Sequence, residues 1–171
     1  MRPDFIQSPG MILAGFSFFG NPFHNAVGWS VENEIGRLWQ RFIPFLQEHA
    51  ELLVPYIIQS DYYYELHIET YETAKTGEYE VFVGCEVNQP VDLWPQISFK
   101  HLQPSTYACF TLKGKEITGD WSTLIFEGWL KQSEYESAFP VVIERYDSRY
   151  LGVEQVEQSE LDVLVPIKLR G

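Results

Sequence analysis

The chain has 171 residues, of which 12 are basic and 24 are acidic, so its formal charge at pH 7 is −12. This length suits a single domain that buries about 70% of its unfolded surface and needs no metal ion or disulfide framework. Hydrophobic residues make up 45% and aromatic residues 16% of the chain, which excludes intrinsic disorder. The acidity and the lack of clustered Lys and Arg argue against direct nucleic-acid binding, so the charge keeps the protein soluble or attracts cations.

Both cysteines, Cys85 and Cys109, lie in apolar strand-like runs, where the usual role of the residue is that of a small buried hydrophobe. Two cysteines are too few for a disulfide framework, and we expect a reduced, cytoplasmic protein. The apolar stretch 11–19 is too short to span a membrane, and it lacks the basic leader and cleavage site of a signal peptide. We therefore expect no membrane association.

The first predicted elements are a strand and a helix. Residues 11–19 form an apolar run between two turns rich in Pro and Gly, which is typical of a buried strand. Pro44 lies inside the helical pattern that follows and lacks the N–H of a helical hydrogen bond, so we expect a kink or break near Ile43. The apolar residues of that pattern share one helix face: Ile35, Leu38, Trp39, Phe42 and Leu46.

Two alternating segments, 62–70 and 79–87, predict a pair of neighbouring antiparallel strands with one solvated face. The first segment places Tyr64, Leu66 and Ile68 on one face, and Glu65, His67 and Glu69 on the other. A histidine between two carboxylates can bind a metal ion, but a solvated strand face is the commoner explanation. We expect no metal site here.

The second half of the chain repeats this element order. The stretch 88–104 carries three prolines and is expected to be a connector, with a short strand around 97–99. The elements after it are a strand at 107–112, a helix over 121–129 with Thr118 or Asp120 as its cap, and strands at 141–146 and 161–167. The order is β-α-β-β twice, over about 11–87 and 107–168. The sequence thus predicts an α+β fold with two main helices on one side of a largely antiparallel sheet.

Sequence motifs of catalysis are absent. The chain has no phosphate-binding loop and no serine in a nucleophile elbow. Its histidines lie far apart on unlike elements: His24, His49, His67 and His101. We assign no catalytic residue, no metal ligand and no cofactor.

Glu144 is the strongest candidate for a functional charge. In the strand 140–146, alternation places Glu144 on one face with Val142 and Tyr146, and Arg145 on the opposite face. Whichever of the two faces is buried, it therefore holds one charged side chain among apolar neighbours. The alternative is that both residues straddle an edge strand. Aromatic residues also recur near strand and helix faces, where most are core: Trp39, Tyr64, Tyr107, Trp121, Trp129 and Tyr146.

Taken in order, six motifs over about 11–168 resemble the GyrI-like effector-binding family, also called the bacterial transcription-activator effector-binding domain. They are 34–42 (EIGRLWQRF), 79–87 (YEVFVGCEV), 107–110 (YACF) followed by Gly114, 129–135 (WLKQSEY), 140–146 (PVVIERY) and 161–167 (LDVLVPI). The resemblance implies one domain over 1–171, two β-α-β-β repeats about a pseudo-twofold axis, and a ligand groove between them.

The resemblance also implies a ligand site. In the drug-binding members of the family, a buried glutamate in the penultimate strand pairs with cationic, aromatic, lipophilic compounds, and Glu144 occupies the matching place. The aromatic positions vary in the family and transfer only as candidates: Trp39, Tyr64, Tyr107, Trp121 and Tyr146. Only ten residues precede the first predicted strand, so we expect a standalone domain without the DNA-binding domain of the regulators.

Three functions remain open at this point. The first is a standalone module that senses or sequesters cationic or aromatic small molecules, and we expect this binder rather than an enzyme. The second is a small-molecule hydrolase in which a pocket glutamate acts as general base. The third is a protein-interaction module of the gyrase-inhibitor type, whose partner would meet the acidic surface.

Overall fold

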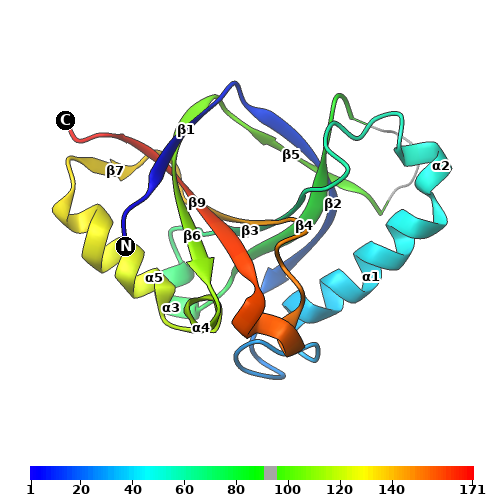
Figure 1. The fold of residues 1–171 in the computed structure, drawn as a ribbon, viewed down its shortest axis with the longest axis horizontal. Coiled ribbons are helices and arrows are strands. Elements are labelled where there is room, and N and C mark those ends of the chain that lie inside the picture. The colour runs from blue at the N-terminus through cyan, green and yellow to red at the C-terminus, as the bar shows by residue number, and fades with distance from the viewer. Residues whose placement is uncertain (91–95) are drawn as a thin grey trace.

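A computed structural model describes residues 1–90 and 96–171, and it has an α+β architecture in which all strand pairs are antiparallel (Figure 1). The strands are β1 (Asp4–Ser8), β2 (Met11–Gly20), β3 (Tyr63–Ile68), β4 (Tyr79–Val87), β5 (Ser98–Leu102), β6 (Ser105–Lys113), β7 (Tyr135–Ser137), β8 (Val141–Tyr146) and β9 (Glu160–Leu169). The α-helical segments are α1 (Glu34–Glu48), α2 (Ala50–Leu53), α3 (Thr73–Thr76), α4 (Lys115–Thr118) and α5 (Trp121–Thr123). A π-helix, η1 (Leu124–Leu130), continues α5, and a 3₁₀ helix, η2 (Val153–Gln158), precedes β9.

The sheet has a symmetric strand order, β1-β6-β9-β8-β3-β4-β2-β5, with β7 added on β9. The first repeat is β2-α1-β3-β4 and the second is β6-helices-β8-β9, and the two meet where β3 pairs with β8. Outward from this seam, the strands of the first repeat follow the order β3-β4-β2 and those of the second the equivalent order β8-β9-β6. The predicted α+β fold class with its duplicated β-α-β-β order is therefore confirmed. The exact residue limits of the domain and of its two repeats stay a prediction.

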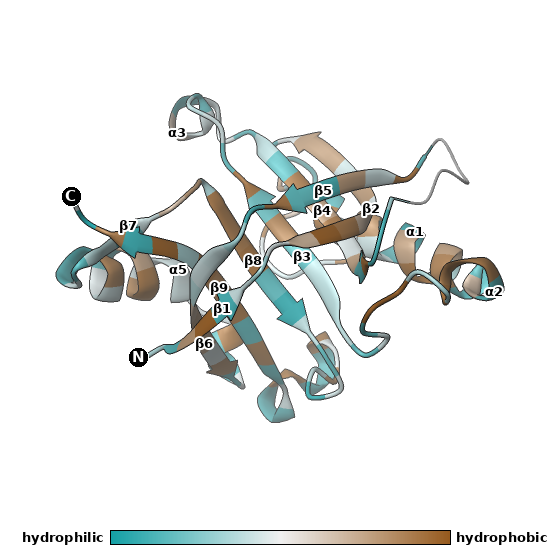
Figure 2. Cartoon of the chain, turned by 90° about the horizontal axis from the view of Figure 1, so that it is seen from above, coloured by the Kyte–Doolittle hydropathy of each residue, from teal (hydrophilic) through white to brown (hydrophobic). Residues whose placement is uncertain are grey.

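The sheet curls around one core, which we call the inner face. Its members are fully or almost fully buried and come from both repeats: Leu13, Tyr64, Leu66, Phe82, Tyr107, Ile143 and Leu164. Figure 2 looks down on the curled sheet and shows hydrophobic and hydrophilic bands alternating along its strands. Gly10 has φ +98°, and a Cβ at this position would lie 2.8 Å from the Leu102 carbonyl oxygen. The backbones that lead into β2 and out of β5 thus pass close together, which only glycine permits here.

The opposite face carries the helices, and we call it the helix-covered face. On one half, Leu38 and Phe42 of α1 pack against a cluster that includes Phe16 and Val83. On the other half, η1 packs Ile125 against strand residues such as Phe110. Both helical segments lie on the same side of the curled sheet (Figure 1), as the sequence predicts.

Helix α1 differs from the prediction at Pro44. Asn33 caps the helix by accepting a hydrogen bond from the Gly36 N–H at 2.8 Å. The helix then runs unbroken to Glu48, so of the kink or break expected near Ile43, the break is wrong and the kink stays a prediction. Proline removes one hydrogen bond from a helix interior, but the apolar face of α1 is anchored on the sheet, and tertiary packing supplies most of a helix's stability.

The second main helix begins as expected but takes a different period. Asp120 is its cap and accepts from the Thr123 N–H at 3.2 Å. Only α5 is α-helical, because η1 is a π-helix in which Ile125 and Leu130, five residues apart, are buried. Leu124, which the 3.6-residue period places on the buried face, is 57% exposed.

The remaining differences lie near the chain ends and the connector. Strand β1 pairs with β6 and was not predicted, while β5 confirms the short strand near 97–99 and extends it to Leu102. Part of the predicted connector, 91–95, lies outside the described residues. In the two described ranges, no helix has the length and apolar character needed to cross a membrane.

We predict that Tyr107→Phe raises the free energy of unfolding by about 1 kcal/mol, because a buried hydroxyl without a partner costs free energy. Tyr107 is fully buried, and none of the described residues forms a hydrogen bond with its hydroxyl. Tyr64→Phe is the matched control on the same face, because the Tyr64 hydroxyl interacts with the Glu86 carboxyl group and each affects the pKa of the other, and this change should destabilise. Urea unfolding measures both, and a clear loss of stability in Tyr107→Phe would contradict the assignment.

Candidate functional site

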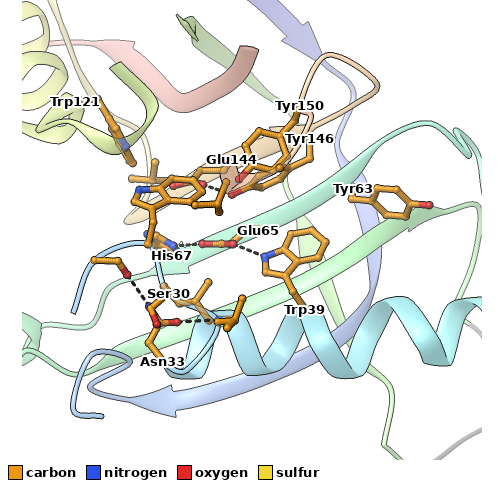
Figure 3. Close-up of a pocket in the computed structure, with 18 of the residues that line it drawn as sticks. Ser30, Asn33, Trp39, Tyr63, Glu65, His67, Trp121, Glu144, Tyr146 and Tyr150 are labelled. Carbon is orange, nitrogen blue, oxygen red and sulfur yellow. Dashed lines mark hydrogen bonds and ion pairs between the residues drawn. The ribbon is translucent and has the colours of Figure 1, made fainter. Parts of the chain in front are cut away.

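A cavity of about 1300 Å³ opens on the helix-covered face where β3 and β8 meet (Figure 3). The helix α1 borders it on one side and the α5–η1 segment on the other, so the centre of the sheet forms its floor. The loop between β2 and α1 and the loop after β8 also contribute, through residues such as Trp29 and Tyr150. The site therefore lies between the two repeats, at the place that the family resemblance implies for a ligand groove.

Two glutamates lie side by side on this floor. Glu65 of β3 is directly opposite Glu144 of β8 in the antiparallel register, and each is only 3% exposed. Like charges directly opposite each other on neighbouring strands are destabilising. The fold therefore places two acidic groups next to each other at the base of the cavity, and we call Glu65, His67, Glu144 and Tyr146 the floor cluster.

Neighbouring donors hold the carboxylates in place (Figure 3). Trp39 on α1 donates its indole N–H to Glu65 Oε2 at 2.6 Å, and His67 Nε2 contacts Glu65 Oε1 at 2.7 Å. The Tyr146 hydroxyl donates to Glu144 Oε2 at 2.5 Å. These bonds repay part of the cost of taking charge out of water, and they fix both side chains before any ligand arrives.

The cluster has perturbed proton affinities. Burial and the charge of Glu65 raise the pKa of Glu144 to about 7, although His67 and the hydrogen bond from Tyr146 act in the opposite direction. Burial disfavours protonated His67, but its hydrogen bond to Glu65 and the charges of Glu65 and Glu144 outweigh this and raise its pKa. Burial raises the pKa of Tyr146 well above its ordinary value, so its hydroxyl remains a donor. Glu144 thus gains or loses a proton near neutral pH.

Aromatic side chains form most of the cavity wall. The Trp39 ring meets the Tyr146 ring edge-on at 5.1 Å between centroids, and Tyr146 meets Tyr150 in the same way at 4.9 Å. The aromatic lining comes from both repeats and their loops: Phe23, Trp29, Trp39, Tyr63, Tyr79, Trp121, Phe126, Tyr146 and Tyr150. A carboxylate floor under aromatic walls suits a ligand that is apolar and carries a positive charge.

The structure brings together four of the six candidate residues from the sequence. Glu144, Tyr146, Trp39 and Trp121 all line the cavity. The other two, Tyr64 and Tyr107, do not: both are buried in the core of the inner face. Tyr64 adjoins Glu65 along β3, and successive side chains of a strand point to opposite faces.

Glu65 and His67 are the residues that sequence reasoning misassigned. The alternation of 62–70 was correct, but the face with Glu65 and His67 is not solvated, because Glu65 is buried and His67 is only 20% exposed. The missing information is that β3 pairs with β8 as well as β4. A central strand of an antiparallel sheet can keep one solvated face, but here Trp39 of α1 and the other aromatic residues of the cavity cover the face that carries Glu65. A usable signal was the aromatic run 62–64 directly before Glu65.

Strand β8 is also central, so the alternative that Glu144 and Arg145 straddle an edge strand is wrong. It pairs with β3 on one side and β9 on the other. Arg145 points to the face opposite Glu144 and donates to buried Asp162 at 2.7 Å, and Arg149 contacts the same carboxylate at 2.6 Å. Each face of β8 therefore carries one charge, and only that of Glu144 faces the cavity.

The floor also contains a set of potential metal ligands. One oxygen each of Glu65 and Glu144 and a ring nitrogen of His67 lie within 4.8 Å of one another. The sequence predicted no metal here because it placed Glu65 on a solvated face, and the burial of Glu65 removes that reason. Two of the three groups already bond to each other, which favours a role in charge balance.

Comparisons with known proteins agree with this architecture. The family profile described as GyrI-like small molecule binding domain matches residues 1–168. The structure of SAV2435 bound to tetraphenylphosphonium has 17% sequence identity and a TM-score of 0.68, over 98% of this chain and 94% of that chain. A putative bacterial transcription regulation protein from Staphylococcus aureus has 16% identity and a TM-score of 0.65, over 98% and 99%.

The C-terminal domain of EcmrR is similar as well, with 12% identity and a TM-score of 0.67 over 99% of this chain and 98% of that chain. At these identities, the three structures show a shared fold. No curated protein sequence matches the chain.

We predict that Glu144 makes the folded state less stable as pH rises. Its folded pKa of about 7 lies above the ordinary 4.5, so the folded chain binds more protons between these values, and its stability falls across this window and then levels off. The loss attributable to Glu144 is on the order of 1–3 kcal/mol. His67, with its raised pKa, acts with the same sign, so Glu144→Gln should flatten the profile without abolishing it.

Thermal or urea unfolding from about pH 5 to about pH 8 measures this slope. The exposed Glu72, the N-cap residue of α3, provides a control, since Glu72→Gln should keep the wild-type profile. Equal slopes for wild type and Glu144→Gln would show that Glu144 titrates normally and is not held in a buried anionic pair.

Proposed function

The chain belongs to the GyrI-like family of small-molecule binding domains, and on this basis we propose that its cavity binds cationic, aromatic or lipophilic compounds in the cytoplasm, for sensing or sequestration. The observation that carries the proposal is the buried pair Glu65 and Glu144 beneath aromatic walls. This arrangement combines one fixed region of charge with a large, shape-tolerant apolar surface. Such a site favours broad selectivity over a single ligand shape.

The energetics favour a cation. An opposite charge at 4 Å from a carboxylate contributes about 4 kcal/mol at an effective dielectric constant of 20. Aromatic faces add about 0.5–2 kcal/mol each through cation–π contacts, and Trp39, Trp121 and Tyr150 are available for them. An anionic ligand would instead meet repulsion from both floor carboxylates.

The comparison with SAV2435 supports the same ligand class. That protein was solved bound to tetraphenylphosphonium, an aromatic cation, and it shares the fold of this chain over nearly its whole length. Its 17% identity does not transfer individual contacts. The proposal therefore depends on the residues of this cavity.

Hydrolysis of a reactive small molecule is the second candidate function. It is favoured by one observation, the Tyr146–Glu144 hydrogen bond of 2.5 Å inside a cavity where the pKa of Glu144 is about 7. A carboxylate of this pKa can take a proton from water while the water oxygen attacks an electrophilic carbon. The Tyr146 hydroxyl then lies beside the same site as a proton donor.

We predict that Glu144→Gln weakens the binding of cationic dyes by about 2–4 kcal/mol, because it removes the counter-charge while keeping the size of the side chain. Neutral dyes of the same shape should lose much less. Fluorescence or calorimetric titration at about pH 8, where Glu144 is ionised, gives both affinities.

Glu86→Gln is the matched control for this test. Glu86 is another partly buried strand carboxylate with a pKa raised by burial, but it lies on β4 and does not line the cavity. Unchanged dye affinity in Glu144→Gln, or an equal loss in Glu86→Gln, would show that Glu144 is not the counter-charge of the bound dye.

Turnover separates the two candidate functions. A binding module returns its ligand unchanged, and we expect mass spectrometry to recover the intact cation after prolonged incubation with the protein. Recovery of a hydrolysed product that disappears in both Glu144→Gln and Tyr146→Phe would establish the hydrolase instead.

A further inference from the structure

We propose that the cavity selects cations that carry an N–H group, such as a protonated amine or an amidinium, over quaternary onium cations of similar size. This inference rests on the proposed function and narrows its ligand class. It follows from which oxygen atoms of the floor cluster are already engaged and which one is open.

Three of the four carboxylate oxygens of Glu65 and Glu144 already have a hydrogen-bond partner. Glu65 has both oxygens occupied, Oε1 by His67 and Oε2 by Trp39. Glu144 has Oε2 occupied by the Tyr146 hydroxyl. Within the described ranges 1–90 and 96–171, no residue donates a hydrogen bond to Glu144 Oε1. A carboxylate on a side chain that is 97% buried therefore keeps one acceptor for whatever fills the cavity.

An unused acceptor in such a place favours a donor. Buried polar atoms are nearly always hydrogen-bonded, and a bond between an ionised donor and a carboxylate is roughly twice as strong as one between neutral groups. An N–H group lets the charged nitrogen approach the oxygen to about 2.8 Å. The alkyl or aryl groups of an onium ion keep its central atom farther away and leave Oε1 without a hydrogen bond, and the Coulomb attraction falls as the inverse of distance.

The neighbouring carboxylate strengthens this preference. Glu65 lies opposite Glu144 and is held by Trp39 and His67, so it cannot turn away from the second charge. A proton donor at Glu144 Oε1 places positive charge next to both carboxylates at once. Trp39 and Tyr146, whose rings meet edge-on, line the same cavity, so an aryl body joined to a small N–H head would meet aromatic walls.

The test compares two probes with the same aryl body, 4-phenylbenzylamine in its protonated form and the corresponding trimethylammonium salt. Calorimetric titration at about pH 8 keeps the amine protonated and Glu144 ionised. Two neutral analogues report the effect of head size alone. An ethyl group replaces the protonated aminomethyl group, and a neopentyl group replaces the trimethylammonium-methyl group. After this correction, we expect the amine to bind at least about tenfold more tightly, and Glu144→Gln to reduce the difference to less than about threefold.

The outcomes separate this inference from the proposed function. Equal or tighter binding of the corrected quaternary cation would overturn N–H selection, even though cation binding itself would stand. Loss of the amine preference in Glu86→Gln as well as in Glu144→Gln would also overturn it, because Glu86 lies outside the cavity. If neither cation binds better than its neutral analogue, the proposed function itself fails.

Discussion

The central constraint in this structure is the placement of two carboxylates, Glu65 and Glu144, directly opposite each other on the middle strands of the sheet. Burying one unpaired charge is costly, and burying two of the same sign side by side is costlier still. The surrounding elements are arranged so that this is tolerated: α1 supplies the Trp39 indole, β3 supplies His67, and β8 supplies the Tyr146 hydroxyl. Removing Trp39 or His67 would take one of two partners from Glu65, and removing Tyr146 would take the hydroxyl donor from Glu144.

The fold explains why such a pair forms at this place. Each repeat covers its own part of the sheet with helical segments, so the seam between repeats, where β3 pairs with β8, is left without a helix above it. The result is a cavity whose floor belongs to both repeats and whose walls are aromatic. The register is strict, because a shift by one residue would send Glu65 and Glu144 into the inner core and bring Tyr64 and Arg145 to the cavity.

Much of this could be predicted from the sequence, and the failures have a common cause. Alternation and helical spacing identified most of the elements, the repeated order and the position of Glu144, because these depend on contacts close in the chain. Whether a strand is central or at an edge depends on pairing between residues far apart, such as Glu65 with Glu144. That information decided the burial of Glu65 and placed Tyr107 away from the cavity, and no local pattern carries it. The π-helical period of η1 was missed for a related reason, since it is fixed by how Ile125 and Leu130 pack on the sheet.

The most direct test of the central claim is a count of the protons released when a cation binds. A monocationic aromatic dye is titrated by calorimetry at about pH 6.5 in two buffers of different ionisation enthalpy, where the raised pKa of about 7 keeps much of Glu144 protonated. If Glu144 is the counter-charge, binding should release up to about one proton per dye, and Glu144→Gln should abolish this release. Binding of equal strength in both proteins with no proton released would contradict the account.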